Sequence, residues 1–151
     1  MATVRMGLPQ DVPVLVEYWH AMLVECGLQG SGFVPDWRER LTQTFETDLA
    51  MESGVWFVAE AEGVIAGACA LFFQTGRSNI SLDKTAMLAG MYVPPRFRGR
   101  GIARGLLDRA VAYCRERGVK TIRLNASEMG RPLYESAGFV TATEMMRLNL
   151  S

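Results

Sequence analysis

Residues 91–114 read MYVPPRFRGRGIARGLLDRAVAYC, and this stretch decides the fold: an apolar strand end, a basic glycine-containing turn and the start of a helix. Gly99 and Gly101 allow backbone angles that are closed to other residues, and they leave room for a ligand to approach the main chain. After Gly101, apolar residues recur every three to four positions, which predicts an amphipathic helix. The first turn of that helix has amides without intrahelical partners at the positive end of the helix dipole, so the sequence predicts an anion site.

The turn is rich in arginine, which favours a ligand with several negative charges. The arginines around it are Arg96, Arg98, Arg100 and Arg104. A solvated connection without function could have the same composition, so the turn alone does not decide between the two interpretations. A dinucleotide fingerprint is not supported, because Ala103 and Arg104 stand before Gly105 and the third glycine is missing. A Walker loop is excluded because Gly-Lys-Ser/Thr does not occur.

The composition predicts a single compact domain over residues 1–151, since 49% of the chain is hydrophobic. Sixteen basic and sixteen acidic residues cancel, so we expect neither nucleic acid nor an anionic membrane as a partner. Three widely spaced cysteines and one histidine predict neither a disulfide framework nor a metal site. The start of the chain lacks a signal-peptide core and no apolar run is long enough to span a membrane, so we expect a cytoplasmic protein.

Hydrophobic periodicity predicts a mixed α/β fold. Helices are expected at residues 12–26, 37–50, 101–118 and 127–137. Strands are expected at residues 3–6, 55–61, 64–74, 86–93 and 120–126, with two short strands or one bent strand at 139–150. The turn at Glu62-Gly63 predicts an antiparallel hairpin, whereas a strand, helix and strand around Gly101 require a parallel pair.

A second motif lies roughly thirty residues after the basic turn and reads Leu133-Tyr134-Glu135-x-x-Gly138-Phe139. Each motif is weak alone, but the two together are fairly specific. With Arg96-x-x-Gly99-x-Gly101-Ile102-Ala103, this motif makes the chain similar to the GNAT superfamily of acyl-CoA N-acyltransferases over essentially its whole length. The resemblance implies an α+β fold with a mostly antiparallel sheet of six to seven strands, about four helices and a parallel pair splayed at the acyl-CoA site.

The resemblance also implies acetyl-CoA as co-substrate and no metal. Amides and side chains would hold the pyrophosphate at Arg98, Gly99, Arg100, Gly101, Ile102 and Ala103. Exposed strand backbone would pair with the pantetheine arm at Met91, Tyr92 and Val93. Ser127 stands where many relatives have an asparagine that contacts the cofactor, and Gly130 stands where alanine is common. These departures leave it open which group supplies that polar contact.

Tyr134 is the catalytic residue that the resemblance implies. Aminolysis of a thioester expels a thiolate whose acid has a pKa near 8.5, and a phenol with a pKa near 10 can protonate it. From the residues alone, the favoured interpretation of Tyr134 is a half-buried aromatic on a short helix beside Phe139. The sequence does not select a general base: the candidates Glu25, Asp83, Glu128 and Glu144 are also ordinary surface acids. His20 lies among apolar residues and is interpreted as structural.

The expected function is direct transfer of acetyl from acetyl-CoA to an amine of an unidentified small molecule or peptide. Cys69 lies within a strand and Cys114 on an apolar helix face, so neither is expected to form an acyl-enzyme. The alternative is a non-catalytic, acyl-CoA-binding regulatory module. The oligomeric state is open between monomer and homodimer. The acceptor would be shaped by the first two helices and by the loops at residues 27–35 and 75–84, which contain no recognisable motif.

Overall fold

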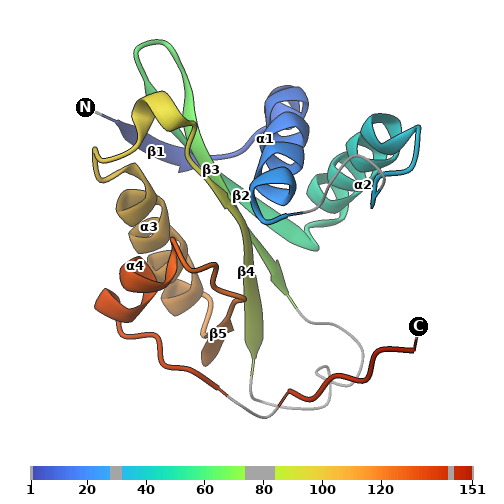
Figure 1. Ribbon diagram of the computed structural model, residues 1–151. Helices are drawn as coiled ribbons and strands as arrows, with labels where there is room; N and C mark the ends of the chain where they lie inside the picture. The colour runs from blue at the N-terminus through green and yellow to red at the C-terminus, as the bar shows by residue number, and fades with distance from the viewer. Residues whose placement is uncertain (1, 28–31, 74–83, 143–144, 151) are drawn as a thin grey trace.

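The computed structural model describes residues 2–27, 32–73, 84–142 and 145–150. Along the chain the elements are β1 (Thr3–Met6), η1 (Pro9–Asp11), α1 (Val12–Glu25), α2 (Trp37–Met51), β2 (Gly54–Ala61), β3 (Val64–Phe73), β4 (Thr85–Tyr92), η4 (Pro95–Phe97), α3 (Ile102–Glu116), β5 (Thr121–Arg123) and α4 (Arg131–Ser136) (Figure 1). The longest helices, α2 and α3, have 15 residues each, and no helix in the described part of the chain is long and apolar enough to cross a membrane.

The sheet has the strand order β1-β2-β3-β4-β5. The first four strands are antiparallel to their neighbours, and β4 pairs with β5 in parallel. Glu62 and Gly63 join β2 to β3 with positive φ angles of 53° and 77°. Two left-handed residues are what a tight two-residue hairpin turn requires, because they match the twist of the flanking strands. The predicted hairpin and the predicted parallel pair are therefore both confirmed.

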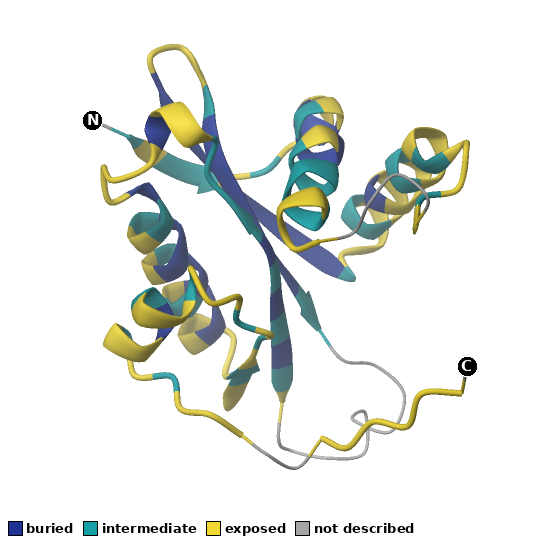
Figure 2. Ribbon diagram, viewed as in Figure 1, coloured by how far each residue is buried: buried dark blue, intermediate teal, exposed yellow. Residues whose placement is uncertain are grey.

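Helices cover both faces of the sheet, α1 and α2 on one side and α3 and α4 on the other (Figure 1). Alternate residues of β2 enter the two layers: Trp56 packs in the cluster with α1 and α2, whereas Phe57 packs in the cluster with α3. The central strands are consequently buried on both faces (Figure 2). This burial on both faces explains the continuous apolar runs of β2 and β3 in the sequence.

The parallel pair opens towards its far end. β5 contacts β4 only where residues Thr85–Met87 face residues Thr121–Arg123, whereas β4 continues to Tyr92. On the other side of β4, the register with β3 shifts between Ala68 and Ala70, opposite Gly90, whose φ is 66°. A bulge of this kind bends a strand and redirects its side chains. The second half of β4 is therefore left with a free edge beside α3 and α4 in the described part of the molecule, as the expected splay requires.

The C-terminal segment differs from the prediction. Residues 139–142 and 145–150 contain no strand, and side chains such as Met146 and Leu148 are exposed. The sheet accordingly has five strands in the described residues instead of six to seven. Alternation alone cannot make a strand, since a strand needs a partner edge, and β5 offers only Thr121–Arg123 where residues 120–126 were expected.

The last helix is also shorter than predicted. α4 begins at Arg131 instead of residue 127. Before it, the Gly130 amide donates to the Ser127 hydroxyl at 3.1 Å. A serine side chain that bonds to nearby backbone stabilises a turn at the expense of helix, which is why the helix starts later.

A buried ion pair fixes the N-terminal strand to the start of α1. The Asp11 carboxylate is 5% exposed and accepts hydrogen bonds from Arg5 at 2.8 and 3.0 Å and from the Leu8 amide at 2.7 Å. The hydrogen bonds from Arg5 lower the pKa of Asp11, against the opposing effect of burial. A carboxyl whose pKa is lowered on folding stabilises the protein above its unfolded pKa, and this contribution is lost as the pH falls through the folded pKa.

We therefore predict that Asp11→Asn lowers the free energy of unfolding by about 2 kcal/mol at pH 7, because hydrogen bonds to a charged group are lost. Urea unfolding followed by circular dichroism measures this change. The variant should also lose less stability than wild type when the pH is lowered below about 4. Glu60→Gln is the matched control: Glu60 accepts from the same Arg5 at 2.7 Å but is 49% exposed, so its loss should cost less than about 1 kcal/mol. Equal losses from both substitutions would contradict this account.

Candidate functional site

The turn between β4 and α3 forms a cradle of backbone amides, residues 99–104. Phe97, which is 1% exposed, anchors the turn in the core. Gly99 and Gly101 have φ angles of 77° and 79°, and a Cβ atom added at either would meet nothing within 4 Å. Glycine is thus required here for backbone conformation, and the space beside the main chain is open. The first helical hydrogen bond of α3 runs from Gly105 N to Gly101 O at 3.0 Å.

The amides of the cradle have no acceptor. Within the described residues, no backbone or side-chain oxygen accepts a hydrogen bond from the N–H groups of residues 99–104. They lie at the N-terminus of α3, where the helix dipole places partial positive charge. Consecutive unpaired amides with left-handed residues among them form a concave anion site. The cradle therefore has the unpaired donors and the open space that a phosphate or pyrophosphate would need.

Arg98, directly before the cradle, is held by two contacts. Its Nε donates to the Val93 carbonyl at 2.8 Å, and one terminal nitrogen donates to Glu25 Oε1 at 2.6 Å. The guanidinium also lies over the ring of Tyr92, 5.7 Å from its centroid. The Arg98 side chain is thus directed towards α1 and the end of β4. No pattern in the sequence indicated the contact with Glu25, because the two residues are 73 positions apart.

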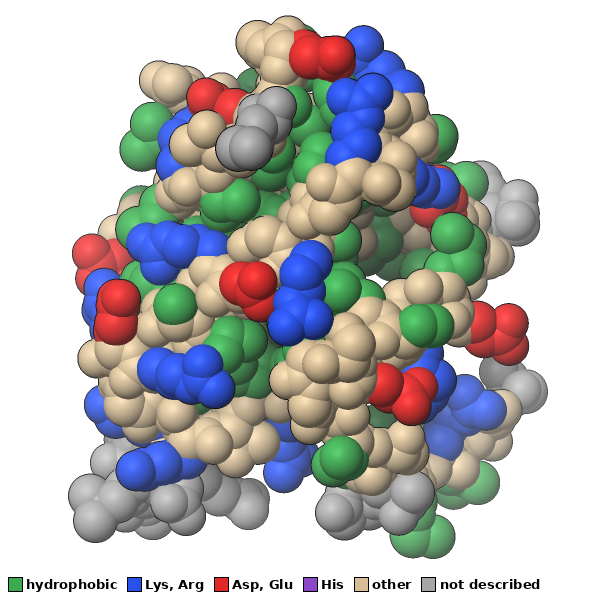
Figure 3. Space-filling model, turned by 90° about the vertical axis from the view of Figure 1, so that its left-hand side faces the viewer, with side chains coloured by type: hydrophobic (Ala, Val, Ile, Leu, Met, Phe, Trp, Pro, Cys, Tyr) green, Lys and Arg blue, Asp and Glu red, His purple; other side chains and the backbone are tan. Residues whose placement is uncertain are grey.

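The other arginines of the turn have looser partners. Arg100 lies 3.8 Å from Glu62 at the hairpin turn, and Arg104 is 3.0 Å from Asp108 on the same helix. Arg96 lies over the ring of the buried Phe97. Viewed from the side of α3 and α4, Lys and Arg side chains are scattered among Asp and Glu and do not form one patch (Figure 3). Exposed pairs of this kind contribute little energy, so Arg100 and Arg104 are only weakly held by their acidic partners.

The end of β4 carries the three residues predicted to line the pantetheine arm. Met91 and Val93 pack against the cluster on the α3 side of the sheet. Tyr92 points the other way, and its ring centroid is 5.2 Å from that of Tyr18 in α1. Because the pairing with β5 ends at Met87, the backbone edge here faces no described strand. An extended ligand can add to such an edge through main-chain hydrogen bonds.

Gly90 is enclosed by an aromatic ring that sequence reasoning did not place there. A Cβ atom at Gly90 would lie 2.6 Å from the Trp19 ring, so no other residue fits without moving the indole. Trp19 in turn packs edge-on against Phe45, Trp56 and Phe72. Trp19 therefore covers β4 at Gly90 on the α1 side of the sheet. The apolar helical face containing Trp19 was visible in the sequence, but its contact with Gly90 depends on the bulge.

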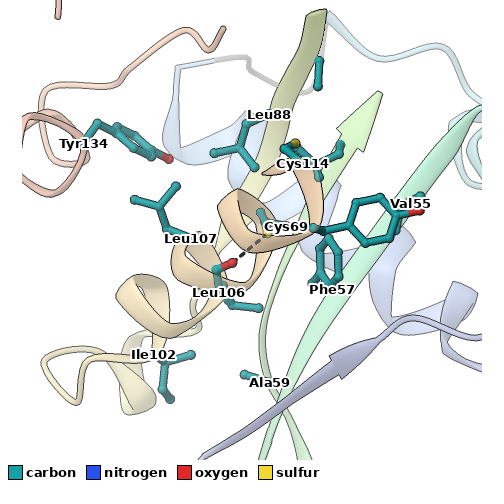
Figure 4. Packing of buried hydrophobic residues seen from close by; sticks show 14 of the residues in the cluster. Val55, Phe57, Ala59, Cys69, Leu88, Ile102, Leu106, Leu107, Cys114 and Tyr134 are labelled. Atoms are coloured by element: carbon teal, nitrogen blue, oxygen red, sulfur yellow. Dashed lines mark hydrogen bonds between the residues drawn. The ribbon is translucent and has the colours of Figure 1, made fainter. Parts of the chain in front are cut away.

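Tyr134 lies in α4 and is 8% exposed. Its ring packs edge-on against Phe139, with centroids 5.8 Å apart. In Figure 4 the ring points from α4 towards Leu88 of β4, beside Leu107 of α3. Burial is the main cause that raises the pKa of Tyr134 to about 12. The phenol accordingly keeps its proton throughout the neutral range, and it faces the splayed half of the parallel pair.

The buried cysteines are unreactive by environment. Cys69 is 0% exposed, its thiol points to the Leu106 carbonyl at 3.9 Å, and burial raises its pKa to about 12 (Figure 4). Burial also raises the pKa of Cys114. Since the thiolate is the nucleophilic form, neither side chain is activated. Cys26, at the end of α1, is exposed.

The structure places three other residues that the sequence analysis singled out: Ser127, His20 and Glu128. The Ser127 hydroxyl accepts from Gly130 and closes the turn before α4. His20 stacks on Trp37, with centroids 4.1 Å apart and planes inclined by 10°, which supports a structural role. Glu128 is exposed. Asp83 and Glu144, also considered as bases, lie outside the described residues.

The chain is similar to known acetyltransferases over most of its length. The model of the "Acetyltransferase (GNAT) family" matches residues 18–139. A mycothiol acetyltransferase from Propionibacterium freudenreichii subsp. shermanii is 30% identical over 139 residues, which cover 89% of this chain and 42% of that protein. The chain therefore spans less than half of that relative's length.

Two solved structures resemble the whole fold. One is a predicted acetyltransferase with acetyl-CoA from Clostridium acetobutylicum, with a TM-score of 0.84, 32% identity and coverage of 99% of this chain and 97% of that one. The other is a GCN5-related N-acetyltransferase from Ralstonia eutropha JMP134, with a TM-score of 0.86, 27% identity and full coverage of both chains.

Proposed function

Because the chain belongs to the GNAT family of acetyltransferases, we propose that it transfers the acetyl group of acetyl-CoA to an amine. The observation that carries this proposal is the row of unpaired amides at residues 99–104, with open space beside two left-handed glycines. A cradle of this kind suits a pyrophosphate, and acetyl-CoA contains one. The similar structure from Clostridium acetobutylicum, which is of an acetyltransferase with acetyl-CoA, supports the choice of co-substrate.

Each part of the site has a task in this proposal. The amides of the cradle hold the pyrophosphate, and Arg100 and Arg104 supply positive charge beside it. The free edge of β4 at Met91, Tyr92 and Val93 holds the pantetheine arm through its main chain. When bound, acetyl-CoA supplies an activated acetyl group and a thiolate leaving group. Fixing both reactants in one slot supplies much of the acceleration.

Tyr134 holds the proton that the departing sulfur requires. Its pKa is raised to about 12 by burial, so the hydroxyl keeps its proton at neutral pH. As the C–N bond forms and the C–S bond breaks, Tyr134 donates its proton to the sulfur, which avoids a thiolate charge in an apolar environment. The proton that the attacking amine nitrogen loses then restores the phenol. General-acid assistance of this kind contributes roughly 10²–10⁴ to the rate.

Direct transfer predicts that no cysteine carries the acetyl group. Cys69→Ala should keep kcat within about twofold of wild type, because the buried thiol is neither exposed nor ionised. Steady-state kinetics measures this, and iodoacetamide labelling of the native protein should modify the exposed Cys26 while sparing Cys69. A loss of activity of 100-fold or so, with unchanged stability, would instead indicate an acyl-enzyme at Cys69.

The test of the proposed function is a thiol-release assay with acetyl-CoA over a panel of amines, together with calorimetric titration of CoA. Amino acids, small primary amines, polyamines, aminoglycosides and peptides with free N-termini represent the acceptor classes. We expect CoA binding and acceptor-dependent thiol release with at least one class. Binding without release for any class would favour the non-catalytic module, and a lack of CoA binding would overturn both.

A further inference from the structure

The ion pair between Glu25 and Arg98 connects the end of α1 to the turn that forms the cradle. Glu25 is the last residue of α1, and Arg98 directly precedes the cradle. Their 2.6 Å contact and the 2.8 Å bond from Arg98 to the Val93 carbonyl engage two of the three guanidinium nitrogens. With side chains 35% and 44% exposed, both residues remain accessible to solvent and to a ligand.

The contact with Glu25 directs the Arg98 guanidinium away from the cradle, although Arg98 directly precedes the cradle in the chain. A guanidinium is well suited to bidentate binding of phosphate, and Arg98 is attached to the backbone at the edge of the cradle. Glu25 balances its charge, however, and two of its three nitrogens already donate to the Glu25 carboxylate and the Val93 carbonyl. For Arg98 to bind a phosphate through both terminal nitrogens, the contact with Glu25 must first break.

We infer that Glu25 lowers the affinity of the cradle for CoA by withholding Arg98, an inference that rests on the proposed function. Glu25 touches neither co-substrate in this account and acts through Arg98, so it is a positioning residue. Without Glu25, tighter binding of CoA would slow its departure after acetyl transfer. Release of product limits turnover in many enzymes, so a lower affinity for CoA favours a higher kcat.

The test is a calorimetric titration of CoA into variants of the full chain. Glu25→Gln should tighten CoA binding by about two- to fivefold, which is the range of an exposed ion pair. Glu25→Lys should tighten it further, because it adds a positive charge. Both gains should shrink as the salt concentration rises, since charges near the surface are screened. A gain of affinity is a result that partial unfolding cannot produce.

A matched control exists on the same helix. Glu17 of α1 pairs with Arg38 through a 2.7 Å contact, also at the surface, and lies about 12 Å from Glu25 along the helix axis. Glu17→Gln and Glu17→Lys change the net charge equally but leave Arg98 in place, so they should leave CoA affinity unchanged. In the background of Arg98→Gln, which itself should weaken binding, the effect of Glu25→Gln should be lost.

The outcomes separate this inference from the proposed function. If wild type binds CoA and Glu25→Gln binds it equally or more weakly, Glu25 has only a structural role and the inference is overturned. If Glu17→Lys tightens binding as much as Glu25→Lys, the effect is one of net charge and the inference again fails. If wild type itself shows no affinity for CoA, it is the proposed function that fails.

Discussion

Replacing Gly101 with valine is expected to weaken CoA binding by about 100-fold or more. The residue has a φ of 79° and is the N-cap of α3, in the middle of the cradle. A β-branched residue strongly disfavours this region, so the backbone would move and the amides around it would lose their common direction. Its side chain would also fill the open space where the ligand must approach. Losing two hydrogen bonds to a charged group costs roughly 3 kcal/mol, which corresponds to about 100-fold in affinity.

The other end of α3 provides a matched control for this change. Gly118 has a φ of 72°, and an added Cβ would likewise meet nothing within 4 Å. Gly118→Val should therefore suffer a similar loss of stability from backbone strain, but it should bind CoA as wild type does. Calorimetric titration and urea unfolding of both variants separate the two effects. Comparable CoA affinity for Gly101→Val and Gly118→Val would show that the cradle does not bind the cofactor.

Tyr134→Phe is expected to lower kcat by about 10²–10⁴, with little change in CoA affinity. The substitution keeps the ring that packs against Phe139 and removes only the hydroxyl. Without a donor, the sulfur must leave as a thiolate in an apolar environment. Steady-state kinetics with the best acceptor, and calorimetry with CoA, measure the two quantities. An unchanged kcat would remove Tyr134 from the mechanism and leave it with a packing role.

Tyr113→Phe is the control for this prediction. Tyr113 is 6% exposed in the same hydrophobic cluster, where it packs edge-on against Phe57, so it has the burial of Tyr134 without the position beside β4. We expect kcat to stay within about twofold of wild type. The pH profile gives a second check: since burial raises the pKa of Tyr134 to about 12, loss of its proton should not reduce kcat between about pH 7 and pH 10. A basic limb within that range must belong to another group.

The parts of the fold that the sequence predicted are those decided by local rules. The hairpin follows from two turn residues between β-branched runs, and the α3 cradle follows from glycines before a helical pattern. Both depend on residues within about 20 positions of one another. The resemblance to a known family added Tyr134, because a half-buried tyrosine on a short helix has no local signature of catalysis.

The parts that could not be predicted depend on which distant elements meet. The contact of Trp19 with Gly90 requires the bulge in β4, and the pair of Glu25 with Arg98 requires α1 to end beside the cofactor turn. The C-terminal strand prediction failed for a related reason. The alternation of Met146 and Leu148 describes which residues could share a face, but pairing needs an edge strand longer than the three residues of β5.

Phe97 determines how the cradle meets its ligand. Because the ring is fixed in the core and the Gly101 carbonyl already accepts from Gly105, the turn holds its shape before anything binds. The protein therefore loses little conformational entropy when CoA binds, and most of the entropy loss comes from the flexible ligand. Stiffening the arm of a CoA analogue in its bound conformation should accordingly improve its affinity more than any added rigidity in the turn.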